Sequence, residues 1–548
     1  MKANACRRLG GALAVLIWLA SLSAWGQESG KNEAFIAALN RISQGSMPER
    51  EQAIEQLAEL DSAQGLPVLQ ALLEGRLYAL RADGQVVIVQ EEGQDYRVSE
   101  AAGGKAAGTM ARDALVKIQV TNKLRSGLRK TIGQLQLKSG KAALRLEAVR
   151  AMAKNPDVRS LALLQAHRAY ETDDGVRQEI DRVFLLQDMD SADRKVRLKA
   201  IAALKDHDSI EVVNRLKAIV EKDAGGGLTE SDEEIRNRAA LALRDIDTRL
   251  NLYAAAETVF FGLSLGAVLV LAAIGLAITF GVMGVINMAH GELMMLGAYT
   301  TYVMQQLLPN HLGLSVVLAI PAAFLMAALA GIAIERGIIR FLYGRPLETL
   351  LATFGVSLIL QQSVRSVFSP LNRSVATPGW MSGSWQINDF LSLTWNRFYI
   401  LVFCLLVFFL LLQILKRTRL GLEVRAVAQN RTMARAMGIP TGRVDALTFG
   451  LGSGIAGVAG VALSQITNVG PNLGQAYIVD SFMVVVFGGV GNLFGTLVAG
   501  FSLGIANKFL EPYAGAVLAK ILVLVFIILF IQKRPRGLFP QKGRAAEA

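Results

Sequence analysis

The chain has 548 residues, of which 52% are hydrophobic, and a formal net charge of +12 at pH 7. This length predicts two or three structural units rather than one. The two cysteines, Cys6 and Cys404, are too far apart to indicate a disulfide framework or a metal site. Lys and Arg of the second half occur in short clusters between apolar runs, the positive-inside pattern of a membrane protein, so we expect no nucleic-acid partner.

The apolar residues are unevenly distributed. Residues 30–250 are rich in charge, whereas long apolar runs follow from about Thr258. We therefore expect an all-α fold: a polytopic α-helical membrane region over 255–535, preceded by a separate domain over 27–250. A short cytoplasmic tail, 536–548, would follow the last span.

The first 26 residues have the form of a secretory signal peptide. A basic start and an apolar run over 13–20 precede small residues at Ala24 and Gly26, the positions expected before a cleavage site. An uncleaved anchor helix is the alternative. Either form predicts that the domain over 27–250 lies outside the inner membrane, in the periplasm.

This exported domain is expected to be helical with one small β-hairpin. Apolar residues at helical period predict helices over 49–60 and 66–73. An Asp-Gly pair between two β-prone runs predicts a tight hairpin over 77–89. The Gly- and Ala-rich stretch 91–110 is expected to be loop.

A helical repeat follows. Segments 144–153, 196–204 and 235–243 each contain an Arg, an Ala three residues later and then apolar residues at helical spacing. Repeats roughly 40–50 residues apart resemble HEAT-type helix pairs. Such stacks present surfaces to other proteins. The domain is therefore predicted to dock a partner rather than to catalyse, since His167 and His207 lack a nucleophile–base arrangement.

Eight apolar stretches are candidate membrane spans, because a spanning helix needs about 20 apolar residues. They are 258–282, 286–307, 313–335, 348–368, 398–415, 446–466, 478–507 and 516–532. Basic clusters after the third, fifth and last spans should be cytoplasmic. This orientation requires a break in 478–507 at Gly488–Asn492, giving about eight or nine crossings. Broken backbone at membrane depth must be buried or line a cavity, so the break is a candidate pathway element.

Glycines four residues apart predict close helix packing. Gly262/Gly266 and Gly500/Gly504 have this spacing. Rarer polar groups within the apolar runs are candidates for a translocation path or gate. These are Asn287, His290, Glu292, Gln361, Gln465, Asn468 and Asn492. For the first three, a gating or structural role at a helix junction is favoured over substrate contact, and the uncharged residues could simply cross-link helices.

Three motifs resemble the ABC permeases of the branched-chain amino-acid type. They are FGVMGVINMAHGE over 280–292, GLEVRAVAQN and ARAMGIP within 421–440, and RPRGLFP over 534–540. The resemblance covers 255–540 and implies a permease subunit that works with a second permease, two ATPase subunits and a periplasmic substrate-binding protein. The chain has no GxxxxGK[ST] loop, so ATP is expected on the partner subunits and no cofactor or metal on this chain.

Within this resemblance, 422–437 is predicted to be a cytoplasmic coupling helix. Gly438 suits a C-terminal cap and Pro440 prevents continuation. The residues expected to couple to the ATPase are Glu423, Arg425, Asn430, Arg431, Ala434 and Gly438. An ordinary amphipathic surface helix is the alternative.

The large exported extension resembles that of urea permeases in this family, so urea is the expected cargo. Branched-chain amino acids and short amides are alternatives. An ion-coupled secondary transporter would need buried carboxylates, for which Glu292 and Asp480 are the candidates. A sensor that signals through the membrane is a third class.

Overall fold

The computed structural model describes residues 33–539, except 61, 93–94, 155 and 222–228. The predicted signal peptide and the tail beyond Phe539 lie outside these residues. The chain divides into two compact units. Unit 1 comprises the residues up to His207 together with Arg215–Ala242, and unit 2 comprises Asp208–Asn214 and the chain from Leu243 onward.

The first described helix of unit 1 spans 33–44 and was not predicted. It is followed by α2 (Met47–Leu60) and α3 (Ser62–Leu73), which the apolar period predicted. The predicted hairpin is the antiparallel pair β1 (Leu77–Leu80) and β2 (Val86–Glu92). It is part of a larger sheet, however, so the expectation of a lone hairpin in an all-α fold is wrong.

The stretch predicted to be loop contains β3 (Asp95–Glu100) and β4 (Ala106–Met110). With β5 (Leu115–Lys117) they complete a five-stranded sheet in the order β4-β3-β2-β1-β5. A 3₁₀ turn, η1 (Arg112–Ala114), separates the last two strands. Tyr96 and Val98 of β3 alternate into a small core with Val87 and Val89. The Gly- and Ala-rich composition masked this alternation.

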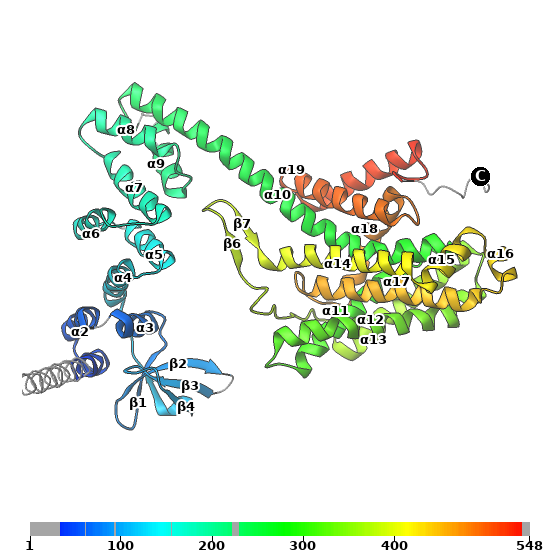
Figure 1. Cartoon of the computed structure of the whole chain (residues 1–548), viewed down its shortest axis with the longest axis horizontal. Coiled ribbons are helices and arrows are strands. Elements are labelled where there is room, and N and C mark those ends of the chain that lie inside the picture. The colour runs from blue at the N-terminus through cyan, green and yellow to red at the C-terminus, as the bar shows by residue number, and fades with distance from the viewer. Residues whose placement is uncertain (1–32, 61, 93–94, 155, 222–228, 540–548) are drawn as a thin grey trace, which may run out of the picture. The chain divides into compact units, whose positions relative to one another are not determined.

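The remainder of unit 1 is helical (Figure 1). Its helices are α4 (Asn122–Leu137), α5 (Ala142–Ala153), α6 (Val158–Arg168), α7 (Asp174–Asp188), α8 (Arg194–Leu204) and most of α9 (Ile210–Val220), whose first residues are grouped with unit 2. The long α10 (Glu233–Met283) begins here. The three repeated segments fall on α5, α8 and the start of α10. Asp157, Asp173 and Asp193 cap α6, α7 and α8 by accepting backbone N–H bonds.

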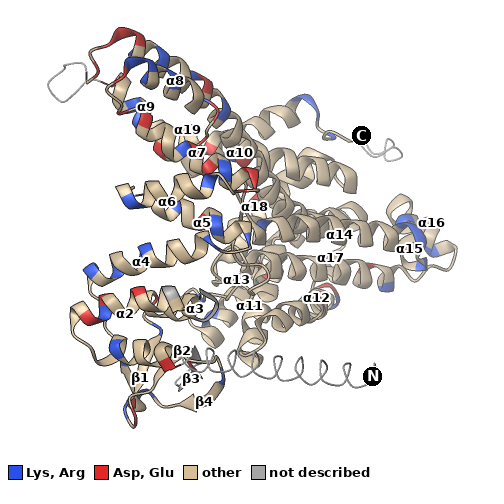
Figure 2. Ribbon diagram, turned by 60° about the vertical axis from the view of Figure 1, so that its left-hand side comes forward, with Lys and Arg blue, Asp and Glu red and all other residues tan. Residues whose placement is uncertain are grey.

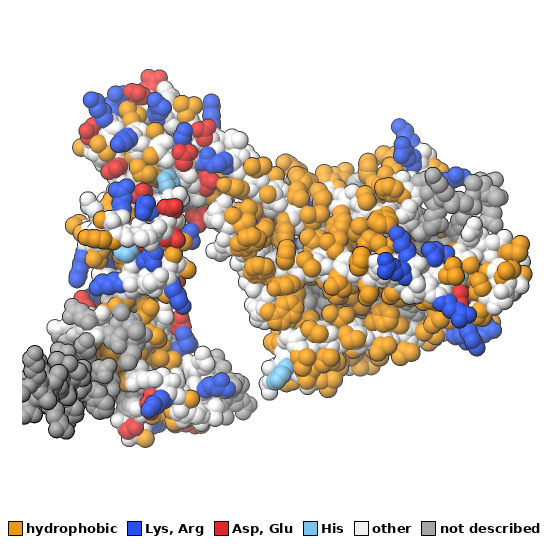
Figure 3. Space-filling model, viewed as in Figure 1, with side chains coloured by type: hydrophobic (Ala, Val, Ile, Leu, Met, Phe, Trp, Pro, Cys, Tyr) orange, Lys and Arg blue, Asp and Glu red, His pale blue; other side chains and the backbone are white. Residues whose placement is uncertain are grey.

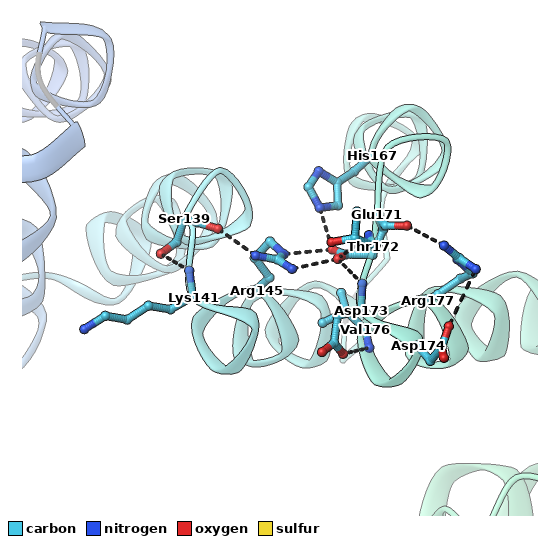
Figure 4. Close-up of polar contacts among 10 residues, drawn as sticks. All are labelled: Ser139, Lys141, Arg145, His167, Glu171, Thr172, Asp173, Asp174, Val176 and Arg177. Atoms are coloured by element: carbon cyan, nitrogen blue, oxygen red, sulfur yellow. Dashed lines mark hydrogen bonds and ion pairs between the residues drawn. The ribbon is translucent and has the colours of Figure 1, made fainter.

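A buried carboxylate joins two of these helices (Figure 4). The Glu171 side chain, 1% exposed, accepts hydrogen bonds from Arg145 Nε (2.8 Å) and Nη2 (2.7 Å) on α5 and contacts His167 Nε2 (2.9 Å). It also accepts from the backbone N of Asp173 (2.9 Å), and Arg177 on α7 donates to the Glu171 carbonyl. The hydrogen bonds from Arg145 outweigh the effect of burial and lower the pKa of Glu171 to about 2.

The same arrangement recurs at Glu230. Its carboxylate pairs with Arg197 on α8 and accepts from the Asp232 backbone N (3.0 Å), while Arg236 on α10 donates to the Glu230 carbonyl (2.7 Å). The strings Glu171–Arg177 (ETDDGVR) and Glu230–Arg236 (ESDEEIR) align without a gap. The repeat therefore includes a Glu, three residues before a helix, that the helical pattern alone did not show.

Unit 2 is a bundle of long apolar helices (Figures 1 and 3). Besides α10 it contains α11 (His290–Leu307), α12 (Leu312–Gly337), the 3₁₀ turn η2 (Ile339–Phe341), α13 (Pro346–Phe368), the strands β6 (Ser384–Gln386) and β7 (Ser392–Thr394), α14 (Trp395–Arg417), α15 (Arg419–Gln429), α16 (Arg431–Ala436), α17 (Thr441–Ser464), α18 (Leu473–Gly488) and α19 (Leu493–Lys533). Within the described residues, α10, α12, α13, α14, α17 and α19 are long and apolar enough to cross a membrane.

The predicted break in 478–507 is confirmed, because α18 ends at Gly488 and α19 begins at Leu493. A second interruption divides α19 at Gly515, whose φ of 76° is not helical. It separates the last two predicted spans.

Glycine contacts hold the bundle together. A Cβ added at Gly266 would lie 2.7 Å from the Phe501 Cα, and one at Gly504 would lie 2.4 Å from the Gly266 backbone N. The two predicted glycine pairs thus cross one another between α10 and α19, at a separation that larger residues would not allow.

Candidate functional site

The helix α11 begins inside the bundle. The ring Nε2 of His290, its first residue, lies 2.9 Å from the Ala272 carbonyl oxygen, and a Cβ on Gly275 would lie 2.9 Å from the same ring. These α10 residues precede the end of that helix, Met283, by eleven and eight positions. At about 1.5 Å per residue, α11 therefore starts roughly 12–17 Å above that end, about half of a ~30 Å bilayer core. Residues 284–289 return to this level without helical structure.

The helix α18 also starts inside the bundle after a non-helical segment. The non-helical residues 465–472 follow α17, and α18 then begins at Leu473. Its first turn touches the first turn of α11: a Cβ on Gly291 would lie 2.5 Å from the Gly474 carbonyl oxygen, and one on Gly474 would lie 2.4 Å from the Gly291 carbonyl carbon. Two interrupted helices thus meet at their N-termini. Non-helical backbone at such depth is tolerated only where it is buried in protein or lines a water-filled cavity.

Three of the predicted path residues surround this crossing. The Glu292 side chain is 1% exposed; its Oε1 accepts a hydrogen bond from Ser357 Oγ of α13 (3.1 Å). Among the described residues, no partner is found for Glu292 Oε2, Asn287 Nδ2 or His290 Nδ1. Unpartnered buried polar atoms are energetically unfavourable and require a reason, such as a solute or water.

A fourth predicted residue, Gln361, lies one turn beyond Ser357 on α13, next to the start of α18. Its Nε2 donates to Asn472 Oδ1 (3.2 Å), and Arg365 Nη2 donates to the same atom (2.7 Å). Sequence reasoning missed Asn472, Ser357 and Arg365. The spacing of Ser357, Gln361 and Arg365, four residues apart, was a usable signal, since it places all three on one face of α13.

For the other predicted path residues, Gln465, Asn468 and Asn492, no hydrogen bond to this cluster is found within the described chain. Gln465 is buried and donates to Ser464 Oγ at the end of α17, and Asn468 is exposed. Asn492 caps α19 by accepting from the Gly495 backbone N (3.1 Å) and donates to the Phe539 carbonyl oxygen (3.2 Å). It therefore belongs to the glycine break, where the motif 534–539 also packs.

The predicted single coupling helix over 422–437 is wrong in one respect. Asn430 is extended (φ −151°, ψ 99°) and separates α15 from α16. Its Oδ1 accepts from the Met433 backbone N (2.9 Å), because Asn caps a helix N-terminus better than it continues a helix. The predicted cap at Gly438 is confirmed: φ is +85°, and Ile439 N donates to the Ala434 carbonyl, as in a Schellman motif.

The structure divides the predicted coupling residues into two groups. Arg431 forms a bidentate ion pair with the buried Asp445 of α17 and lies 3.8 Å from the Tyr343 ring centre, and Ala434 is buried. These two residues hold the segment to the bundle. Arg425, Asn430 and Gly438 are exposed, and Glu423 is half-buried beside Arg419 (3.3 Å).

Sequence reasoning missed three exposed apolar side chains of the segment: Leu422 (61%), Met433 (61%) and Met437 (78%). Figure 2 shows Lys and Arg residues gathered around α15 and α16, the helices that carry Leu422 and Met433. Apolar anchors rimmed by charge are typical of a protein-docking surface.

A polytopic bundle with interrupted helices and an exposed apolar and basic segment defines a membrane transport protein. The family model described as the branched-chain amino acid transport system permease component matches residues 258–531, and the chain belongs to this family. The chain is 31% identical to the permease protein LivH of Escherichia coli over 293 residues, covering 52% of this chain and 94% of that relative.

Two further relatives extend the comparison. BraD of Pseudomonas aeruginosa is 30% identical over 287 residues (50% of this chain, 93% of BraD), and LivM of Escherichia coli is 24% identical over 306 residues (50% and 69%). All three are described as permease proteins of high-affinity branched-chain amino acid transport systems. Matches to both LivH and LivM indicate a pair of related permeases within this type of ABC importer. No solved structure matches the chain significantly.

Proposed function

We propose that this chain is one permease subunit of an ATP-driven importer in the inner membrane, and that a small polar nutrient passes the crossing of α11 and α18. The observation that carries this proposal is the set of unpartnered polar atoms of Asn287, His290 and Glu292 at that crossing. In this scheme ATP is bound and hydrolysed by two partner ATPase subunits. A second permease and a periplasmic solute-binding protein complete the complex.

Two cargoes are candidates. The relatives' names favour a branched-chain amino acid. Urea is favoured by unit 1, because the family match begins only at residue 258 and an exported extension of this size resembles that of the urea permeases. The amide and hydroxyl groups of Gln361, Asn472 and Ser357 suit either solute, since both carry N–H donors and oxygen acceptors.

The proposed coupling element is the segment α15–α16 together with Met437. Leu422, Met433 and Met437 insert into a groove of an ATPase subunit, and Arg425 contacts the rim of that groove. Arg431 transmits the movement to α17 through Asp445. In this assignment Glu423, Asn430 and Gly438 maintain the conformation of the segment and do not contact the ATPase directly.

The proposed role of residues 27–250 is a periplasmic docking module built from HEAT-like helix pairs. The repeated ties at Glu171 and Glu230 support this proposal, because each holds successive repeat helices at a fixed spacing. The membrane domain occupies 255–535.

The cargo is tested by uptake of labelled leucine and labelled urea at micromolar concentration, in a strain that lacks the chain and in the same strain with the chain restored. Restored leucine uptake identifies a branched-chain amino acid importer, and restored urea uptake identifies a urea importer. Restoration of neither contradicts both cargoes.

A further inference from the structure

A cavity of about 250 Å³ lies in unit 2, and its lining includes none of the residues that meet at the crossing. It is partly open to solvent and is lined by residues of α10, the start of α14, the segment 465–472, α18 and both halves of α19 around the Gly515 kink. Five charged side chains line it: Arg397, Asp480, Lys508, Glu511 and Lys520. Three cations against two carboxylates leave one positive charge in excess.

Within the described residues, Arg397 is the cation of this group without an ion pair, although Glu511 lies near enough to interact with it electrostatically. Lys520 Nζ pairs with Asp480 Oδ2 (3.1 Å), and Lys508 Nζ pairs with Glu511 Oε2 (2.5 Å). Arg397 lies over the Phe261 ring, 4.7 Å from its centre, and no ion pair of its guanidinium is found among the described residues. A half-buried guanidinium offers five donors in a planar fork, and a carbonyl or carboxylate oxygen in the cavity could accept one or two of their hydrogen bonds.

Two buried neutral groups on the cavity wall also lack partners within the described chain. Asn507 is 7% exposed and its Oδ1 has no hydrogen bond; Ser264 is 1% exposed and its Oγ has none. Asn507 Oδ1 is an acceptor, so the described part of the wall combines a cationic donor that has no ion pair with a neutral acceptor that has no hydrogen bond.

The cavity is connected to the candidate site by the chain itself. Ile466 and Thr467 line it and belong to the non-helical segment 465–472. The last residue of this segment, Asn472, accepts the hydrogen bonds from Gln361 and Arg365 beside the crossing. A solute held in the cavity would therefore lie against the segment that leads to α18.

We propose that this cavity binds a small solute carrying a carbonyl or carboxylate oxygen next to an N–H group. The oxygen faces Arg397 and the N–H faces Asn507. This chemistry is shared by α-amino acids and by amides, urea included. The inference rests on the proposed function, because the solute class is that of the proposed cargo. In this scheme Arg397 and Asn507 recognise the cargo before it reaches the crossing. Leu265 and Leu269 provide an apolar wall for a branched side chain.

The test is equilibrium binding of labelled leucine and labelled urea to the purified permease–ATPase complex without the solute-binding protein. Arg397→Gln is expected to weaken binding of the cargo about tenfold, since a hydrogen bond to a charged group is lost. Asn507→Leu is expected to weaken it as well. Arg345→Gln, a change at an exposed ion pair with Glu348, is the matched control and leaves binding unchanged. If Arg397→Gln fails to assemble, Arg397→Lys keeps the charge without the fork and should still weaken binding.

The outcomes separate the cavity from the transport assignment. Tight leucine binding identifies an α-amino acid as the occupant, and tight urea binding identifies an amide. Suppose that the wild-type complex imports a solute, and that Arg397→Gln and Asn507→Leu bind this solute as tightly as wild type. This result overturns the cavity site and leaves the importer assignment in place. Import of a solute without measurable binding also overturns it. A complex that imports neither solute overturns the cargo, and the cavity proposal with it.

Discussion

The contact between Gly291 and Gly474 gives a sharp prediction for Gly291→Ala. The added Cβ would lie 2.5 Å from the Gly474 carbonyl oxygen and 2.8 Å from its carbonyl carbon. Both are backbone atoms, so no side-chain rotation relieves the overlap, and reaching even 3.0 Å requires α11 and α18 to separate by at least 0.5 Å. Overpacking of this kind destabilises by about 1–3 kcal/mol. We expect a lower melting temperature of the solubilised chain and a large loss of transport.

Gly355→Ala is the matched control. Gly355 is also in a membrane helix, α13, but an added Cβ would meet nothing within 4 Å. This change should keep transport and raise the melting temperature slightly, because Ala favours helix over Gly by up to about 1 kcal/mol. If Gly291→Ala transports at the wild-type rate and melts no lower than Gly355→Ala, the two helices do not meet as described.

Three further predictions concern other parts of the chain. Glu171→Gln removes the charged partner of Arg145 and should destabilise unit 1 by about 1–3 kcal/mol, measured as urea sensitivity of protease resistance in the full chain. Because folding lowers the pKa of Glu171 from 4.5 to about 2, its stabilisation is complete above about pH 4.5 and is lost as pH falls toward 2; wild type should lose more stability in that window than Glu171→Gln, and equal losses would contradict the prediction. Met437→Glu should reduce co-purification of the ATPase without lowering the melting temperature, whereas unchanged co-purification would remove Met437 from the docking surface. Gly537→Ala should reduce transport, because Gly537 has φ of 75° and its added Cβ would lie 2.6 Å from the Gly489 backbone N, and full activity would show that the C-terminal motif need not pack on the glycine break.

Much of the membrane fold could be predicted from apolar length and charge, but the depth at which α11 and α18 begin could not. Residues 286–307 resemble one continuous apolar span, and only the packing of His290 beside Ala272 shows that the helix starts inside the bundle. Strand β4 was missed for a different reason. Its side chains are almost all exposed, so it has no apolar alternation to detect.

The candidate site was predicted in part, because local sequence shows which polar groups are buried and not which ones meet. Asn287, His290 and Glu292 stand out in an apolar context. The partner of Gln361 is 111 residues away, at Asn472, and no local pattern predicts that pairing. Similarly, the exposure of positions 425 and 438 in the coupling segment follows from local geometry. The ion pair that holds Arg431 to the bundle depends instead on Asp445 from the next helix, α17.

The most direct test of the importer assignment is solute accumulation in proteoliposomes that contain the purified permease–ATPase complex and its solute-binding protein. ATP supplied on the ATPase side should drive accumulation of leucine or urea against its gradient, and an ionophore that collapses ion gradients should leave the rate unchanged. Accumulation that needs an ion gradient and proceeds without ATP would contradict the account and indicate a secondary transporter.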